Sequence, residues 1–326
     1  MPLTILTEAE LRRCVTLDAE VVDAIADAFS ALASGRVVMP PILHVALAEA
    51  NGEVDVKTAY IQGLPNLAIK VSPGFFDNPK QGLPSLSGLM MLLSATTGRL
   101  ETLHLDNGYL TELGTAAAGA VAARHLARSD ARIAGVLGAG RQAQVQIEAL
   151  KLVLPIERVL LWARDPAKAE AAADQTAERL GLDVLPVASA ERLVLEADVV
   201  VTATPSRTPL VVADWLHPGL HITAMGSDAA GKNELHPDVL RRADRLVCDS
   251  RAQCARLGEL QHALAGGAEL DATELGEITS GRRPGRQSND QITVCDLTGT
   301  GVQDTAIAVL AYQQAIAGGL GTRIDN

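Results

Sequence analysis

The sequence of 326 residues lacks the features of several classes of protein. It has no run of lysine and arginine and its formal net charge is −11, which disfavours nucleic acid or an anionic membrane as a partner. No apolar stretch approaches the ~18 residues of a membrane span, and the N-terminus has no basic region followed by an apolar core. We therefore expect a cytoplasmic protein with a small-molecule substrate, and neither a membrane nor a nucleic acid as partner.

The positions of cysteine and histidine do not indicate a metal site either. The four cysteines form no CxxC pair, and neither they nor the histidines show the spacing of metal ligands. Buried free thiols in a reducing compartment explain the cysteines. We expect no metal site, and no serine–histidine–acid constellation can be argued.

The first third of the chain and its C-terminus favour one folding unit. Apolar residues recur at helical spacing from Asp18 to Ser34, and Gly35 follows as a stop. Between Val37 and Leu105 the pattern changes to short runs of period two separated by glycine-containing turns, which predicts a largely antiparallel sheet. A further helix is expected from Gln303 to Ala317, and it could pack back on this first unit.

The middle of the chain alternates strand and helix. An alanine-rich helix is expected over Thr115 to Ala127, followed by helices that start at Arg141 and Pro166. The apolar strands between and after them are expected at residues 132–137, 158–162, 184–187, 198–202, 221–225 and 245–248. Strands separated by helices imply parallel pairing. We predict an α/β fold with a doubly wound parallel sheet (Rossmann) domain at 116–298, and an α+β domain built from 1–115 with 299–326.

A glycine-rich turn follows the first of these strands and opens a helix. It consists of Gly138, Ala139, Gly140, Arg141, Gln142 and Ala143, a GxGxxA pattern in the context in which that pattern has physical meaning. Gly138 permits a tight turn, Gly140 lets the backbone approach a pyrophosphate, and Ala143 keeps helix and strand close. The amides of the helix N-terminus then face the anion. The turn predicts an NAD(P) site, with an ordinary glycine-rich turn as the alternative.

Further cofactor contacts are expected after later strands. Arg164 follows the second strand and could bind a 2′-phosphate, which mildly favours NADP(H), although a solvated side chain is the alternative. Asp165 before Pro166 is explained equally well as a helix cap. At the carboxyl ends of later strands the crevice rule adds two loops, which contain Thr202, Ala203, Thr204, Met225 and Gly226.

With these residues considered, the sequence resembles the ornithine cyclodeaminase/μ-crystallin family over nearly its whole length. The matching stretches are 67–70, 107–111 with 115–118, 138–143, 226–235, 275–277 and 298–304. The runs 72–78 and 294–298 are most similar in appearance to the members associated with ectoine and hydroxyectoine utilisation.

The resemblance implies roles for particular residues. The family's catalytic lysine matches Lys70 and its aspartate matches Asp228, and Thr115 falls among the cofactor-binding positions. As a sequence feature alone, a Ser-Asp pair after a strand is more often a cap. The family also implies a homodimer, in which the α+β domain serves substrate binding and dimerisation.

One departure from the family weakens the assignment of a substrate. Gly114 stands where relatives have an arginine for the substrate carboxylate, a loss that should cost ~2–4 kcal/mol of binding unless replaced. The candidates for replacement are His44, Asp55 and Lys57. We expect Lys57 and Lys70 to hold the carboxylate and Asp55 to attract a second amino group. A solvated sheet face is the alternative for each.

The function that we predict is an NAD(P)H-dependent oxidoreductase acting on the C–N bond of a small amino acid or its imine. An imine reductase or amino-acid dehydrogenase, in ectoine or hydroxyectoine degradation, is the first hypothesis, with the imine of a small diamino acid as candidate substrate. The alternatives are an NAD-dependent ornithine-type cyclodeaminase and a catalytically silent NADPH-binding protein.

Overall fold

The structure is a computed structural model, and it describes residues 2–325. Contacts divide the chain into two compact units. Unit 1 comprises Met1–Thr115 and Thr300–Asn326, and unit 2 comprises Ala116–Gly299. Within residues 2–325, no helix is long and apolar enough to cross a membrane.

Unit 1 is built on an eight-stranded sheet. Its order is β16-β1-β7-β6-β5-β4-β2, with β3 pairing β4. The β1 and β7 strands are parallel and the other neighbours are antiparallel. The strands are β1 (Pro2–Thr7), β2 (Val37–Val38), β3 (Leu43–Leu47), β4 (Gly52–Ile61), β5 (Asn66–Phe75), β6 (Leu89–Ser94), β7 (Leu100–Leu105) and β16 (Thr322–Asp325).

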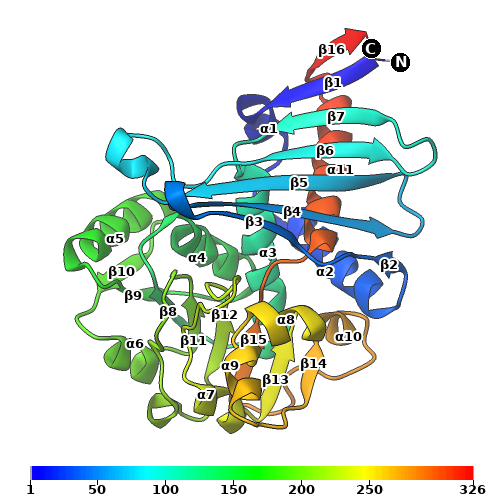
Figure 1. Ribbon diagram of the computed structural model, residues 1–326. Coiled ribbons are helices and arrows are strands. Elements are labelled where there is room, and N and C mark those ends of the chain that lie inside the picture. Colours follow the sequence, from blue (N-terminus) through cyan, green and yellow to red (C-terminus); the bar gives the residue numbers. More distant parts are fainter. Residues whose placement is uncertain (1, 326) are drawn as a thin grey trace. The chain divides into compact units, whose positions relative to one another are not determined.

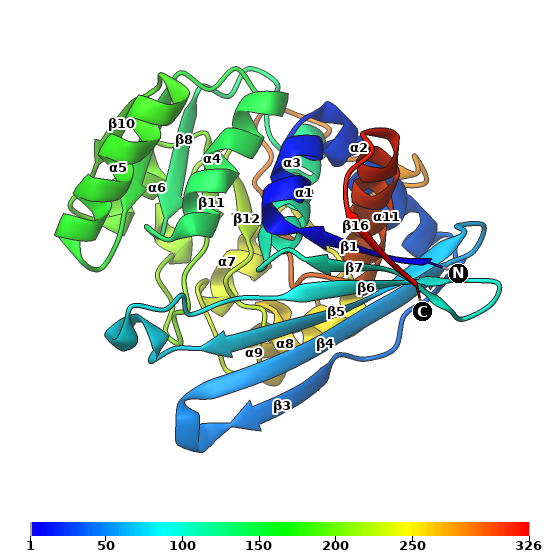
Figure 2. The same ribbon diagram turned by 90° about the horizontal axis from the view of Figure 1, so that it is seen from above.

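Three helices cover one side of this sheet, as Figure 2 shows. They are α1 (Glu8–Cys14), α2 (Ala19–Ala33) and α11 (Gly301–Ala317), and two short 3-10 turns are η1 (Ala48–Ala50) and η2 (Asn78–Gln81). The predicted opening helix is α2, where the Asp18 carboxylate accepts a bond from the Val21 amide at 3.0 Å. Its predicted apolar stripe is buried, which explains why this segment folds against a sheet.

The C-terminal helix α11 packs closely on β4 and β5. A Cβ on Gly301 would lie 2.4 Å from the Thr58 carbonyl oxygen, so only glycine fits there. The Thr305 hydroxyl donates to the Ala59 carbonyl at 2.7 Å and accepts from the Ala68 amide at 3.2 Å. A side chain of the helix therefore bridges two strands, and this contact fixes which face of α11 looks onto the sheet.

Unit 2 contains the predicted doubly wound sheet (Figure 1). Eight strands lie in the order β10-β9-β8-β11-β12-β15-β13-β14, and all neighbouring pairs are parallel. The strands are β8 (Ile133–Leu137), β9 (Arg158–Trp162), β10 (Asp183–Pro186), β11 (Val199–Thr202), β12 (His221–Ala224), β13 (Arg245–Cys248), β14 (Ala272–Glu274) and β15 (Thr293–Asp296). The strand order reverses between β8 and β11, which is where ligands bind in open α/β sheets.

The helices between these strands complete the α/β fold. They are α4 (Arg141–Val153), α5 (Pro166–Leu180), α6 (Ala190–Glu196), α7 (Pro237–Arg242), α8 (Arg251–Leu257), α9 (Leu260–Ala265) and α10 (Leu275–Thr279), with the 3-10 turn η3 (Ala213–Trp215). The residues at which unit 1 ends and unit 2 begins lie within α3 (Tyr109–Leu126).

Candidate active site

The glycine turn after β8 has the geometry that the sequence predicts for it. Gly138 has φ +130°, and a Cβ there would lie 2.7 Å from the Ala203 carbonyl oxygen. Gly140, by contrast, has no described atom within 4 Å of the position of its missing Cβ. The first glycine is therefore required by the packing of the protein itself, whereas the second leaves open space beside the backbone.

The residues of this turn fit the pyrophosphate of a dinucleotide. Gly140 is the N-cap of α4, provides no side-chain cap, and is followed by a first turn without acidic residues. The amides of this 13-residue helix thus begin beside the open space at Gly140, an arrangement that attracts anions. Ala143 is fully buried against the turn.

Arg164 and Asp165, which follow β9, differ in their contacts. Arg164 is exposed at the end of the strand. Asp165 is the N-cap of α5, and its carboxylate accepts a bond from the Ala167 amide at 3.1 Å. Asp165 therefore acts as a helix cap, which was the alternative explanation for this residue.

The loops after β11 and β12 are joined by a residue that the sequence prediction missed. The Glu234 carboxylate accepts bonds from the Thr202 hydroxyl at 2.6 Å, and from the Thr204 amide and hydroxyl at 2.7 Å each. It also accepts from the Gly226 amide at 2.8 Å. Glu234 appeared in the sequence only as part of the family-like run 226–235, and nothing in its spacing indicated that it would be buried.

Asp228 lies on the loop after β12. Its carboxylate is 47% exposed and forms an ion pair with Lys232 at 2.5 Å. The Ser227 hydroxyl donates to the Lys232 carbonyl at 2.8 Å, which closes the same loop. The predicted catalytic aspartate is thus accessible within unit 2, on a loop that its neighbours hold in shape.

Lys70 occupies the middle of β5 in unit 1. Its side chain is 7% exposed, and Nζ donates to the Asp304 Oδ1 at 2.7 Å, whose side chain is 6% exposed. Alternate residues share a strand face, and Ala68 on the same face of β5 is buried. Asp304 was quoted in the sequence only as the last residue of a family-like run, because a partner on a distant helix leaves no local signal.

Other polar groups are buried near Lys70. The Asp106 Oδ2 accepts from the Leu110 amide at 2.9 Å; burial raises the pKa of this carboxyl and the nearby Lys70 charge lowers it, with burial the larger effect. Among residues 2–325, the Oδ1 of Asp106 and the Oδ2 of Asp304 have no hydrogen-bond partner. These oxygens can still accept hydrogen bonds from a ligand amine or from water.

His104 belongs to the same face of the sheet, because it pairs with Met90 and Met90 pairs with Lys70. It is fully buried, and neither ring nitrogen has a hydrogen-bond partner within the described part of the chain. Burial lowers its pKa to about 4, so the imidazole is neutral at neutral pH.

The structure brings the three predicted substrate residues onto neighbouring strands. His44 lies opposite Asp55, and the His44 Nδ1 is 2.7 Å from the Asp55 Oδ1. Lys57 lies directly opposite Lys70, and directly opposite residues of antiparallel strands point to the same side. The expected Lys57–Lys70 neighbourhood is therefore present, but the Lys70 ammonium already has a carboxylate partner.

Gly114, where the family resemblance leads us to expect an arginine, lies on α3. A Cβ there would have a single described neighbour within 4 Å, the Ile307 Cγ2 at 3.8 Å. The Gln303 side chain donates to the Gly114 carbonyl at 3.4 Å. The backbone at this position has room for the first atom of a side chain.

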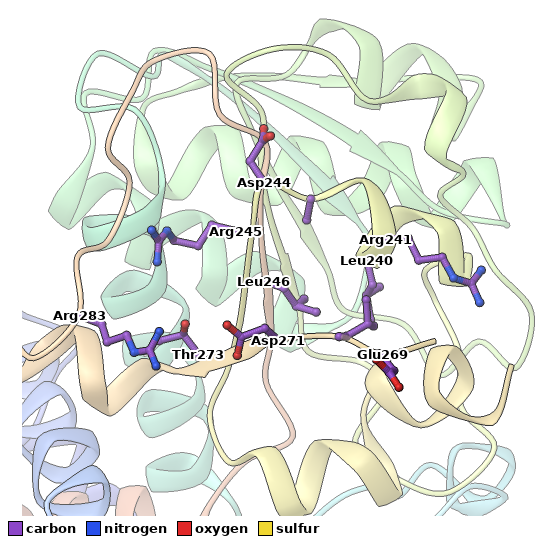
Figure 3. Close-up of a pocket in the computed structure, with 11 residues that line it drawn as sticks. Leu240, Arg241, Asp244, Arg245, Leu246, Glu269, Asp271, Thr273 and Arg283 are labelled. Atoms are coloured by element: carbon purple, nitrogen blue, oxygen red, sulfur yellow. The ribbon is translucent and has the colours of Figure 1, made fainter. Parts of the chain in front are cut away.

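A separate pocket of about 390 Å³ lies at the other end of the unit 2 sheet (Figure 3). It adjoins the amino ends of β13 and β14, whereas the glycine turn lies at the carboxyl end of β8. Three arginines and three acids line it, so their charges balance: Arg241, Arg245, Arg283, Asp244, Glu269 and Asp271. The pocket does not belong to the predicted cofactor site. In the described chain, no three acidic, histidine or cysteine side chains are grouped as metal ligands.

Comparison with known proteins assigns the family. Residues 3–319 match the ornithine cyclodeaminase/mu-crystallin family. The chain belongs to this family. It is 55% identical to a putative dehydrogenase of Rhizobium meliloti, over 99% of both chains.

Two solved structures resemble both units. An archaeal alanine dehydrogenase dimer with bound NAD has a TM-score of 0.91 and 33% identity, covering 100% of this chain and 99% of that one. The Δ1-pyrroline-2-carboxylate reductase of Thermococcus litoralis, in complex with NADH and L-proline, has a TM-score of 0.93 and 30% identity, covering 99% and 100%. The predicted family and fold class are confirmed.

Proposed function

We propose that the protein is an NAD(P)-dependent oxidoreductase acting on the C–N bond of a small amino acid or its imine. The observation that carries the proposal is the full-length likeness to a reductase that binds NADH and L-proline. That likeness spans the Lys70 strand as well as the glycine turn. A turn alone supports only a cofactor, whereas a likeness that covers both units also supports a substrate class.

Unit 2 would hold the cofactor. The turn from Gly138 to Ala143 and the amides of α4 would bind the pyrophosphate, and the loops containing Thr202–Thr204 and Met225–Gly226 would contact the nicotinamide half. When bound, the nicotinamide supplies or accepts a hydride. The preference for NADP(H) rests on Arg164, which is exposed and available to a 2′-phosphate.

Unit 1 would hold the substrate. The Lys70 Nζ donates to the Asp304 Oδ1 at 2.7 Å, and an ammonium held in this way is suited to donate a hydrogen bond or a proton to the substrate. Lys57, opposite Lys70, is a candidate to bind the substrate carboxylate together with Lys70. Asp55, held by His44, could then attract a second amino group.

A cyclodeaminase is the second candidate function. Asp228 favours it, because an exposed carboxylate on the loop after β12 could accept a proton from an amine. The empty position at Gly114 disfavours an ornithine-like carboxylate clamp. A role in ectoine or hydroxyectoine degradation and a cytoplasmic location stay predictions from the sequence.

We also propose a homodimer formed through unit 1. The β3 edge of its sheet has exposed apolar residues, because Leu43 is 60% and Val45 47% exposed. Exposed apolar strands of this kind mark protein interfaces. The related alanine dehydrogenase is a dimer.

The test is cofactor oxidation in the presence of imines. The purified protein is mixed with NADH or NADPH and a panel of keto acids with ammonia or amines, and the absorbance of the reduced nicotinamide is followed. We expect imine-dependent oxidation, and a loss of at least about 100-fold for Lys70→Gln, with Lys80→Gln, an exposed lysine paired with Asp77, as the matched control. No oxidation across the panel would refute the reductase. Ammonia release from a diamino acid with catalytic NAD would establish the cyclodeaminase.

A further inference from the structure

Glu234 is fully buried and its carboxylate is saturated with donors. Its Oε1 accepts from the amide and hydroxyl of Thr204, and its Oε2 accepts from the Thr202 hydroxyl and the Gly226 amide. A carboxylate has about four acceptor positions. No acceptor position is left for a ligand, so Glu234 can act only through the groups that it holds.

The groups that Glu234 holds lie at the carboxyl ends of two neighbouring parallel strands and in the loops that follow them. Thr202 ends β11 and Thr204 follows it, while Gly226 follows β12, the strand that pairs with β11. A Cβ on Gly226 would lie 2.5 Å from the Glu234 Oε2 and 2.2 Å from the Thr204 carbonyl oxygen. The close approach therefore depends on glycine at this position.

The glycine turn contacts the same assembly. Ala203 lies between the two threonines that Glu234 holds, its amide donates to the Leu137 carbonyl at 2.9 Å, and its carbonyl oxygen is the atom closest to the missing Cβ of Gly138. Glu234 thus fixes the segment against which the turn is packed, in addition to the loop after β12.

The backbone of Glu234 is itself anchored. Its amide donates to the Glu259 Oε1 at 2.8 Å, and its carbonyl accepts from the amides of Leu210 and Val211. Glu259 also accepts from the Asn233 side chain and the Leu235 amide. The side chain is therefore presented from a rigid segment, which a positioning role requires.

We propose that Glu234 is a positioning residue for the cofactor, which holds the loops after β11 and β12 in register with the glycine turn. The inference rests on the proposed function, because the loops are worth positioning only if a dinucleotide binds there. It goes beyond that function because it assigns the control of cofactor affinity to an acid that touches no ligand.

The ionisation of Glu234 gives the role a distinct signature. Its pKa is raised to about 7, with burial as the largest cause; the threonine donors lower the pKa and the neighbouring Glu259 raises it. Glu259, from the segment before α9, is the charged group that faces it, and Glu259 in turn faces Asp296 at the end of β15. A protonated Glu234 has one acceptor position fewer, so one of the held donors loses its partner as the pH falls through about 7.

The experiment compares the dissociation constants of NADH and NADPH for the wild-type chain and Glu234→Gln between pH 6 and pH 8, followed by nicotinamide fluorescence. In the wild-type chain we expect affinity to weaken as the pH falls through about 7. In Glu234→Gln we expect affinity at pH 8 to be weaker by about tenfold or more and the pH dependence to be reduced. Circular dichroism verifies the fold of each protein.

The control is Asp198→Asn, which removes a carboxylate that accepts from the amides of Arg132 and Ile133 at the amino end of the same sheet. It should retain the wild-type affinity and pH profile. If Glu234→Gln behaves like the control, the positioning role is wrong while the proposed function stands. If the wild-type chain binds neither NADH nor NADPH, the proposed function fails and the positioning role fails with it.

Should Glu234→Gln not fold, Thr204→Val removes one hydroxyl donor to the same carboxylate. It is expected to weaken binding by a smaller factor and in the same direction. Unchanged binding in Thr204→Val, together with an unchanged pH profile, would overturn the inference.

Discussion

A buried carboxylate in each unit is stabilised by different chemistry. In unit 1, Asp304 faces one full positive charge, the ammonium of Lys70. In unit 2, Glu234 faces no cation in its hydrogen-bonding shell and accepts four bonds from neutral hydroxyls and amides. The first arrangement binds two charges to each other, and the second binds one charge to dipoles.

The difference determines how each acid responds to protons and to mutation. An opposite charge favours the ionised form of an acid, whereas dipoles offset burial only in part, and burial raises the pKa of Glu234 to about 7. Removing one member of a buried ion pair leaves the other uncompensated, which is more costly than losing neutral donors. The Lys70–Asp304 pair should therefore be the more fragile to substitution, and the ionisation of Glu234 should change with pH near 7.

The strongest way to break this comparison is Asp304→Ala. It leaves the buried Lys70 ammonium without its partner, and we expect the free energy of unfolding to fall by about 3–5 kcal/mol. Urea denaturation measures the change. The control is the double variant Lys70→Met with Asp304→Leu, which removes both charges and should recover most of the loss. A double variant as unstable as Asp304→Ala would show that packing, and not charge, dominates.

Glu234, the acid that is held by dipoles, can be disturbed by a substitution of Gly226. Gly226→Ala forces a Cβ to within 2.5 Å of Glu234 and 2.2 Å of the Thr204 carbonyl oxygen, and such overpacking costs about 1–3 kcal/mol. Gly140→Ala is the matched control, because that position is open. Thermal unfolding should show a lower midpoint for Gly226→Ala and little change for Gly140→Ala, whereas both should lose cofactor affinity. Equal midpoints would contradict the steric argument.

The pH dependence of stability sharpens the contrast further. The pKa of Glu234 is raised in the folded chain from 4.5 to about 7, so the folded state binds this proton more tightly than the unfolded state. The stability associated with it is present below about pH 4.5 and is lost as the pH rises through about 7. Glu234→Gln should therefore show a shallower fall of the urea midpoint between pH 5 and pH 7 than the wild-type chain. A parallel pH profile would mean that Glu234 does not titrate there.

An exposed pair supplies the smallest expected effect. Lys80 and Asp77 form an ion pair at η2, with side chains 75% and 47% exposed. Exposed pairs contribute little to stability, because water screens their charges. Lys80→Met should therefore change the free energy of unfolding far less than Asp304→Ala does in urea denaturation. A change as large as that of Asp304→Ala would mean that exposure does not determine the strength of these pairs.

The sequence predicted unit 2 more completely than unit 1, for physical reasons. The strands β9 and β13 and the start of α5 lie where the apolar runs placed them, because parallel βαβ units are built from neighbouring segments. The sheet of unit 1 gains strands that the period-two pattern did not indicate. In particular β6 reads Leu-Met-Met-Leu-Leu-Ser without alternation, and β16 pairs with β1 from the other end of the chain.

The candidate site follows the same rule. The glycine turn was predictable because each of its residues acts on neighbours within the turn and helix. Asp304 and Glu234 were not, since each works on residues at distant positions: Asp304 on Lys70 in β5, and Glu234 on Thr202 in β11. Sequence spacing predicts which residues lie together only when they belong to the same helix or strand and recur at its period.

The Lys70–Asp304 pair has a consequence for how the chain is made. The two residues are separated by 234 positions, and Asp304 belongs to the segment Thr300–Asn326 that completes unit 1. During synthesis the whole of Ala116–Gly299 leaves the ribosome before that segment does, so unit 2 has all its residues available for folding first. Until α11 has been translated, Lys70 therefore lacks the Asp304 carboxylate as its partner. A ribosome that stops before residue 300 would therefore release a chain with a complete unit 2 and a lysine strand that lacks its counterion.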